Sequence, residues 1–303
     1  MKNKLVLAHL AMLTVALIYA ANFTIAKPVM SGDTPYVKPF GFIMMRVIAA
    51  TVLIWISHFL FVREKVESKD LFRLALCAVF GVAGNQLTFF YGLNLTTPIN
   101  GALIMLTTPI LVLILSLIIF GERLTWFKSS GILLGLCGAS FLILSNNSTA
   151  ADAPNPALGN IFIGINAACY ACYLVLVKPM MDKYSPFTTL KWVFLFGTIY
   201  VIPFGFNQMM EIEWQGMPNT ILAAIVYVLV FVTFLTYVLN GAALGIVKPS
   251  VSSAYIYLQP LLASSIAVWA GKDSITWSML FAALLIFAGV YLVSIPTKVA
   301  VHD

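Results

Sequence analysis

Residues 98–126 read PINGALIMLTTPILVLILSLIIFGERLTW, and residues 249–277 read PSVSSAYIYLQPLLASSIAVWAGKDSITW. Both stretches carry two prolines and a Thr-Trp pair at matching places, 151 positions apart. The same spacing relates other pairs along the chain: Tyr19-Ala20 with Tyr170-Ala171, Lys27-Pro28 with Lys178-Pro179, and Gly138 with Gly289. One spacing shared by so many pairs indicates an internal repeat and therefore two halves of similar sequence.

Composition points to a membrane protein. The 303 residues are 61% hydrophobic and only 9% charged, whereas about a quarter of a soluble domain is charged. The apolar residues fall in runs of about 20, the length of one bilayer span. Because lipid satisfies no backbone amide and the runs do not alternate as barrel strands do, we expect helices. The sequence predicts an all-α membrane protein of about ten transmembrane helices, near residues 5–26, 40–62, 71–93, 98–120, 126–145, 158–178, 187–207, 219–242, 250–270 and 275–295.

The repeat divides these helices into two sets of five, near residues 1–147 and 156–297. Since five is odd, the second set enters the membrane with the opposite orientation. Inverted repeats are typical of transporters whose solute site lies near the midplane, between the halves. We therefore expect two inverted five-helix repeats around a central cavity.

Basic residues indicate how the chain is oriented. Thirteen of the 17 Lys and Arg residues fall in gaps on the side of the N-terminus, three fall on the other side, and Arg46 lies within a run. Cytoplasmic loops carry the excess of basic residues, so both termini are expected to be cytoplasmic. The short loops favour the bacterial cytoplasmic (inner) membrane. No basic face of the kind that follows phosphates is present, so no nucleic acid is expected as a partner.

Arg46 is the one ionisable residue that the sequence places well inside a span, about two turns into the second helix. A buried arginine costs roughly 2.5–3.5 kcal/mol on insertion scales, and such residues usually serve function. In a functional role, Arg46 would attract an anionic group of the solute or gate the outer mouth of the transport pathway. In a structural role, it would extend toward the membrane interface as a clamp.

Uncharged polar residues lie near mid-depth in several spans. Tyr19 and Asn22 are three residues apart and share a helix face, as do Tyr237 and Asn240. Each one alone could join two helices instead of binding a ligand. Together they would line a cavity for a neutral or zwitterionic solute, and the sharper hypothesis is that Asn22, Arg46, Asn85, Tyr170, Tyr237 and Gln259 face one cavity. The predicted cavity residues are Tyr19, Asn22, Arg46, Asn85, Gln86, Thr108, Asn166, Tyr170, Tyr237, Asn240, Tyr257 and Gln259.

Pro109 and Pro260 occupy the middle of the fourth and ninth predicted helices. A proline inside a helix frees the carbonyl four residues earlier, here Met105 and Ile256. The bends either improve packing or act as hinges for alternating access.

Enzyme chemistry is disfavoured. The carboxylates lie in gaps, and no cluster of nucleophile, base and metal ligands is visible. Cys169-x-x-Cys172 has redox or metal spacing but lacks a second pair, so these thiols are expected to pack as small apolar groups. We predict no catalytic residue, no metal and no cofactor, and the absence of carboxylates in the spans argues against a carboxylate proton relay.

The stretch Tyr19–Lys27, YAANFTIAK, resembles the first-helix signature of EamA-type transporters in the drug/metabolite transporter superfamily. Arg46, Thr107-Thr108-Pro109 and the turn from Phe120 to Thr125 are similar to later features of that family, as are Gly131 and Gly138. This resemblance implies ten helices around a central cavity and, commonly, export of amino acids, metabolites or drugs. The second half departs from it, with Lys272-Asp273 opposite Gly121-Glu122 and Val193 near the place where Arg46 would repeat, so the halves are functionally unequal.

The expected function is export of an amino acid or related metabolite by alternating access. Uptake or exchange of another small metabolite or drug is the alternative, and a membrane-embedded enzyme is the disfavoured one. The expected partners are a small-molecule solute and the lipid bilayer. The oligomeric state stays open, because one chain supplies both halves.

Overall fold

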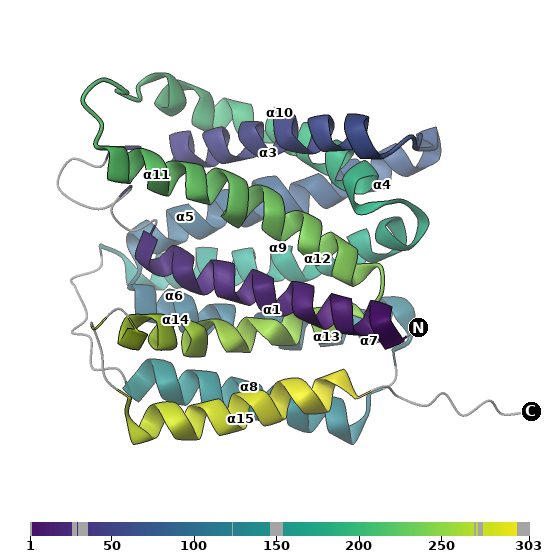
Figure 1. Ribbon diagram of the computed structural model, residues 1–303, viewed down its shortest axis with the longest axis vertical. Coiled ribbons are helices and arrows are strands. Elements are labelled where there is room, and N and C mark those ends of the chain that lie inside the picture. Colours follow the sequence, from purple (N-terminus) through teal and green to yellow (C-terminus); the bar gives the residue numbers. More distant parts are fainter. Residues whose placement is uncertain are drawn as a thin grey trace, which may run out of the picture.

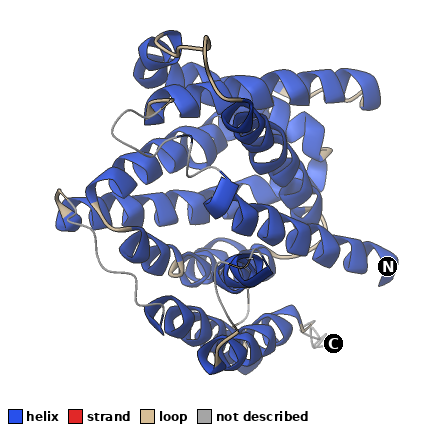
Figure 2. Cartoon of the chain, turned by 60° about the vertical axis from the view of Figure 1, so that its left-hand side comes forward, coloured by secondary structure: helices blue, strands red, loops and turns tan. Residues whose placement is uncertain are grey.

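The computed structural model describes residues 2–25, 29, 36–122, 124–145, 154–269, 271 and 275–295. All of the elements it describes are helical (Figure 2). Ten helices are long and apolar enough to cross a membrane, which confirms the number and approximate place of the predicted spans. The chain is a multi-pass integral membrane protein.

The first half contains five spans, of which the third and the fourth are built from more than one described helical element. Prolines begin α3 and α6 of this half, and in the second half they begin α9 (Pro156–Lys183), α10 (Pro186–Met210) and α13 (Pro249–Ala254). The missing amide hydrogen costs nothing there, because the first turn of a helix has no acceptor for it. The elements of this half are α1 (Lys2–Ile25), α3 (Pro39–Phe61), α4 (Ser68–Ala78), η1 (Val79–Gly84), α5 (Asn85–Leu95), α6 (Pro98–Met105), α7 (Thr108–Phe120) and α8 (Trp126–Ser145).

The second half repeats this order. Its fourth span begins at Pro249, and its last span is capped by Thr276, whose hydroxyl accepts from the Met279 amide. The elements are α9 (Pro156–Lys183), α10 (Pro186–Met210), α11 (Asn219–Tyr227), η2 (Val228–Leu235), α12 (Thr236–Leu244), α13 (Pro249–Ala254), η3 (Tyr255–Tyr257), α14 (Leu258–Trp269) and α15 (Trp277–Ser294).

Irregular segments occur at equivalent places in the two halves. The third and eighth spans each contain a π-helix, η1 and η2, and such segments frequently mark functional sites. The fourth span is interrupted between α6 and α7, and the ninth changes to a 3-10 turn at η3. Both interruptions lie just before Pro109 and Pro260. That these prolines act as hinges stays a prediction.

The two halves exchange equivalent contacts across the bundle. In Figure 1, α3 pairs with α10 at one edge and α8 pairs with α15 at the other. In the middle, α1 packs on α12 and α14 of the second half, while α9 packs on α5 and α7 of the first. Such reciprocal contacts are the mark of a two-fold relation. The prediction of two inverted five-helix repeats is therefore confirmed.

The α8–α15 pair is held together by closely approaching backbones. A Cβ added at Gly131 would lie 2.7 Å from the carbonyl oxygen of Gly289, and one added at Gly289 would lie 2.6 Å from that of Gly131. Small residues allow transmembrane helices to pack this closely. Gly131 and Gly289 thus fix the distance between the last helices of the two halves.

We expect Gly131→Ala to lower the free energy of unfolding by about 1–3 kcal/mol, because the added methyl group overlaps the Gly289 backbone. Gly164→Ala in α9 is the matched control, since a Cβ there meets nothing within 4 Å. It should instead stabilise the helix by about 0.5–1 kcal/mol. Unfolding in mixed detergent micelles measures both, and equal effects of the two variants would contradict the packing explanation.

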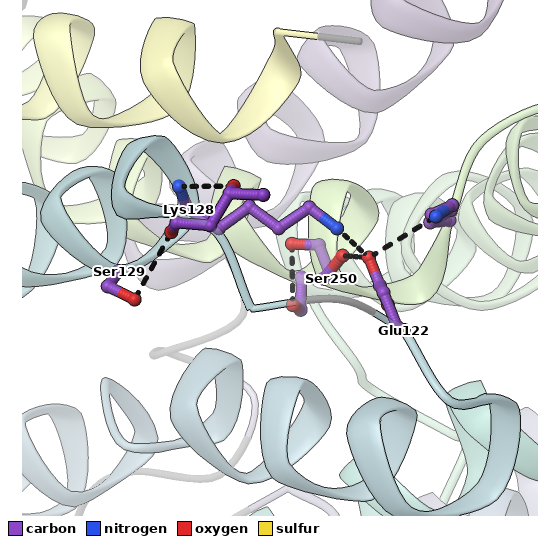
Figure 3. Close-up of polar contacts among 7 residues, drawn as sticks. Glu122, Lys128, Ser129 and Ser250 are labelled. Carbon is purple, nitrogen blue, oxygen red and sulfur yellow. Dashed lines mark hydrogen bonds and ion pairs between the residues drawn. The ribbon is translucent and has the colours of Figure 1, made fainter. Parts of the chain in front are cut away.

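A buried ionic cluster joins the halves at the end of the bundle where α1 begins and α15 ends, here called the N-terminal end (Figure 1). Gly121 ends α7 with φ 59°, and the Glu122 side chain that follows contacts α13. Glu122 pairs with Lys128 of α8, and the Ser250 hydroxyl donates to the same carboxylate at 2.7 Å (Figure 3). The side chains of Glu122 and Lys128 are only 2% and 3% exposed. Both charges are therefore largely shielded from solvent.

Candidate functional site

Arg46 lies on α3 and points toward the second half. Its Nε donates to the Thr233 hydroxyl at 2.9 Å, and its guanidinium carbon lies 6.0 Å from the Phe42 ring and 5.7 Å from the Phe90 ring. No carboxylate pairs with it among the residues that the structure describes. Part of its surface stays accessible although protein surrounds it. The site therefore contains an unneutralised cation with free hydrogen-bonding capacity.

The π-helix η2 places the acceptor for Arg46. The Thr233 hydroxyl donates its only proton to the Val228 carbonyl, five residues earlier, at 2.9 Å. Its lone pairs are then free to accept from Nε of Arg46. Because a π-helix turns more widely than an α-helix, the Val228 carbonyl, five residues earlier, lies within reach of the Thr233 hydroxyl. Thr233 is fully buried, so this contact excludes water.

The π-helix η1 is bonded to the second half in a corresponding way. The Tyr237 hydroxyl donates to the Gly81 carbonyl at 2.8 Å. Just after η1, the Asn85 carbonyl accepts from Nδ2 of Asn166 at 2.5 Å. Each π-helix is therefore connected by hydrogen bonds to a side chain of the opposite half. Any relative movement of the halves would change these bonds.

The hydrogen bonds of Arg46, Tyr237 and Asn166 form what we call the central layer. Aromatic rings surround this layer. Tyr170 and Tyr173 stack with centroids 6.3 Å apart, and Tyr173 lies 6.2 Å from Tyr237. Phe194 meets Tyr237 edge to face at 4.8 Å. The Tyr19 hydroxyl lies 3.4 Å from the Thr236 hydroxyl. The layer offers phenol hydroxyls for hydrogen bonds and ring faces for apolar contact.

A small cavity of about 20 Å³ lies between α1, α9 and the spans of α12 and α14. Four predicted residues line it: Tyr19, Tyr170, Asn240 and Gln259. A volume of this size holds about one water molecule, whereas sites for small organic molecules usually measure about 300–1,000 Å³. The helices would have to separate before a metabolite could enter.

Several buried polar atoms near the centre lack hydrogen-bond partners among the described residues. They are the Asn22 Oδ1, the Asn166 Oδ1 and both amide atoms of Gln86. An unsatisfied buried group costs about 1–3 kcal/mol. A ligand or water that bonds these atoms would recover that cost.

A larger depression of about 510 Å³ lies at the opposite end of the bundle. It is lined by Tyr36, Gln208 and Met217, among others, and by Lys38 and Glu211, which pair at 2.6 Å. Arg46 follows the start of α3 by seven residues, about 10 Å. Arg46 is not among the residues that line the depression.

Some predicted cavity residues lie apart from this layer. Tyr257 is fully buried, and a Cβ at Gly135 of α8 would overlap its ring, so it packs toward α8 and α15. Thr108 is buried at the start of α7, and its hydroxyl meets no described partner. Asn85 contributes a backbone carbonyl to the described contacts. The predicted cavity residues did not include Thr233, Thr236 or Tyr173, because threonine and tyrosine in an apolar run are common packing residues.

The fold and this site define a membrane transporter. A model of the EamA-like transporter family matches residues 6–144 and 157–295, one match in each half. The chain belongs to the EamA-like transporter family, which is a family of transporters and not of enzymes.

The following relatives share about a quarter or less of their residues with this chain. The uncharacterized transporter YyaM of Bacillus subtilis (strain 168) is 24% identical over 238 residues, 78% of each chain. A probable terminal-alkyne amino-acid exporter of Streptantibioticus cattleyicolor is 23% identical over 256 residues, 84% of this chain and 83% of that protein. A solved crystal structure aligns with a TM-score of 0.75 at 17% identity, over 94% of this chain and 95% of the other. It supports the fold alone.

Proposed function

We propose that this transporter exports an amino acid or a related metabolite that bears a carboxylate, by alternating access. The observation that carries the proposal is Arg46, a partly accessible guanidinium without a carboxylate partner among the described residues. A guanidinium matches the geometry of a carboxylate and can bind it through two hydrogen bonds. The surrounding hydroxyls and amides suit the rest of a zwitterionic solute.

Alternating access is supported by the small central cavity. About 20 Å³ cannot contain an amino acid, so a solute enters only when the helices separate. The prolines next to the interruptions before α7 and α14, and the two π-helices, are the places where the backbone can bend. The excess of basic residues in gaps on the side of the N-terminus supports cytoplasmic termini in a bacterial inner membrane.

Export, in preference to uptake, is supported by one relative. The protein of Streptantibioticus cattleyicolor is named a probable terminal-alkyne amino-acid exporter and shares 23% identity over most of both chains. At 23% identity the relative's solute is not assigned to this chain. A carboxylate-bearing solute nevertheless agrees with the guanidinium of Arg46.

The test is flux in proteoliposomes that contain the full chain. Vesicles are loaded with a labelled panel of amino acids, their amides, other small metabolites and cationic drugs, and efflux and uptake are followed. We expect saturable flux of carboxylate-bearing members and not of their amides. Saturable flux confined to members that lack a carboxylate would contradict the proposal.

Thr233 gives a second test of the same site. We expect Thr233→Val to raise the KM for a transported carboxylate about tenfold while changing the maximal rate less, because Arg46 loses the acceptor that orients it. Thr233→Ser keeps the hydroxyl and should preserve the parent KM. Thr88→Val is the control, since the Thr88 hydroxyl bonds only within its own span. Equal KM changes in Thr233→Val and Thr88→Val would contradict a positioning role.

A further inference from the structure

The ionic cluster at the N-terminal end connects the two halves through one carboxylate. Glu122 lies in the turn between α7 and α8 of the first half, and Lys128 belongs to α8. Ser250 lies in the first turn of α13, in the second half, and is fully buried. We call Glu122, Lys128 and Ser250 the latch. Figure 3 shows the Lys128 and Ser250 side chains converging on Glu122.

The donors of the latch come from both halves. Oε1 of Glu122 accepts from Lys128 Nζ within the first half and from Ser250 Oγ across the interface, at 2.7 Å. Lys248, also in the second half, places its Nζ 4.0 Å from the same oxygen. A desolvated carboxylate needs such donors. If the halves moved apart at this end, Glu122 would keep Lys128 but lose Ser250.

The repeat shows that this latch belongs to one end only. The spacing of 151 positions sets Met279 opposite Lys128 and Ile99 opposite Ser250. Neither residue can donate a hydrogen bond from its side chain. The equivalent place in the repeat therefore cannot form the same contact. At the opposite end the halves are joined by the exposed Lys38–Glu211 pair, and exposed pairs contribute only about 0–1 kcal/mol. The buried latch can therefore favour closure of its own end over closure of the other.

We propose that the latch holds the N-terminal end of the bundle closed and that the Glu122–Ser250 hydrogen bond breaks each time this end opens. The proposal rests on the alternating access proposed above. Ser250 acts by positioning the second half against Glu122, and it does not touch the solute. A hydrogen bond to a charged group is strong enough to shift a two-state equilibrium about tenfold.

The test measures how often the N-terminal end opens, without any solute. The four cysteines are replaced by alanine, and Met12→Cys, which lies on α1 and lines the central cavity, reports access for a water-soluble maleimide. Tyr36→Cys, exposed at the opposite end, corrects for reagent activity. We expect Ser250→Ala to raise the labelling rate at position 12 about tenfold. Ser250→Thr, which keeps the hydroxyl, should label at the parent rate.

Two further variants control for loss of packing. Ser253→Ala removes a buried hydroxyl of the same helix that bonds only the Ser250 carbonyl, and it should leave labelling unchanged. Lys248→Glu sets a second carboxylate beside Glu122 from an exposed position, so it should open the latch even where Ser250→Ala does not fold. Parent rates in both Ser250→Ala and Lys248→Glu, or an equal rise in Ser253→Ala, would overturn the latch. Because labelling needs no solute, failure of the flux panel would leave this result standing.

Discussion

Arg46→Ala is expected to reduce transport of a carboxylate-bearing solute by at least about 100-fold, because it removes two charge-assisted hydrogen bonds to the carboxylate. The loss should appear in KM and in the ratio of maximal rate to KM. Arg46→Lys keeps the charge without the planar fork and should recover part of the activity. The variants should also lose discrimination between an amino acid and its amide. Proteoliposome flux with matched protein content measures all three effects.

The control for Arg46→Ala is Arg73→Ala. Arg73 lies on α4, and its Nε donates to the Leu176 carbonyl at 3.1 Å, so it is a structural arginine near the N-terminal end. Its removal should change protein yield more than KM. Unchanged KM and unchanged discrimination in Arg46→Ala, with the protein folded, would show that Arg46 is only a clamp between α3 and η2.

Lys128→Met is expected to lower the free energy of unfolding by about 3–5 kcal/mol, because it leaves the Glu122 carboxylate buried without its cation. Methionine has nearly the shape of the lysine chain and is the residue at the matching position 279. The loss would therefore come from the charge more than from packing. Unfolding in mixed detergent micelles measures it.

The double variant Glu122→Gln with Lys128→Met separates these effects. It removes both charges and keeps an amide that can accept from Ser250, so most of the lost stability should return. Glu211→Gln is the surface control, because Glu211 pairs with Lys38 where both side chains are more than half exposed. Such pairs contribute about 0–1 kcal/mol. A double variant as unstable as Lys128→Met would contradict the ionic explanation.

The two halves share a fold but not a charge distribution. The repeat sets Val193 of α10 near the place of Arg46 in α3, and Val193 is fully buried. The α3–α10 pair therefore carries an arginine on one side only. The latch likewise has no counterpart in the repeat, because Met279 and Ile99 stand at the positions that match Lys128 and Ser250. A scaffold of two similar halves with one such cation and one latch therefore gives each face of the membrane a different energetic environment.

The sequence by itself determined the membrane location, the ten spans and the inverted repeat. Hydropathy runs and a constant spacing are properties of the chain read in order, and the bilayer imposes helices on any such run. The sequence also indicated Arg46 as a candidate functional residue, since an arginine inside a span is costly however the helix is rotated about its axis. Prolines were a weaker guide to where a helix is interrupted. Pro179 and Pro203 lie inside uninterrupted helices, whereas Pro109 and Pro260 follow interruptions.

Only the tertiary structure decided which polar residues meet. Thr233 contacts Arg46 across 187 positions, and Ser250 contacts Glu122 across 128. Tyr257, expected in the cavity, instead packs on Gly135. Each outcome depends on how a helix is rotated about its axis, and a π-helix or a 3-10 turn changes that rotation for every residue beyond it. In an apolar span a periodic pattern is too weak to fix this angle, so packing between the halves sets it.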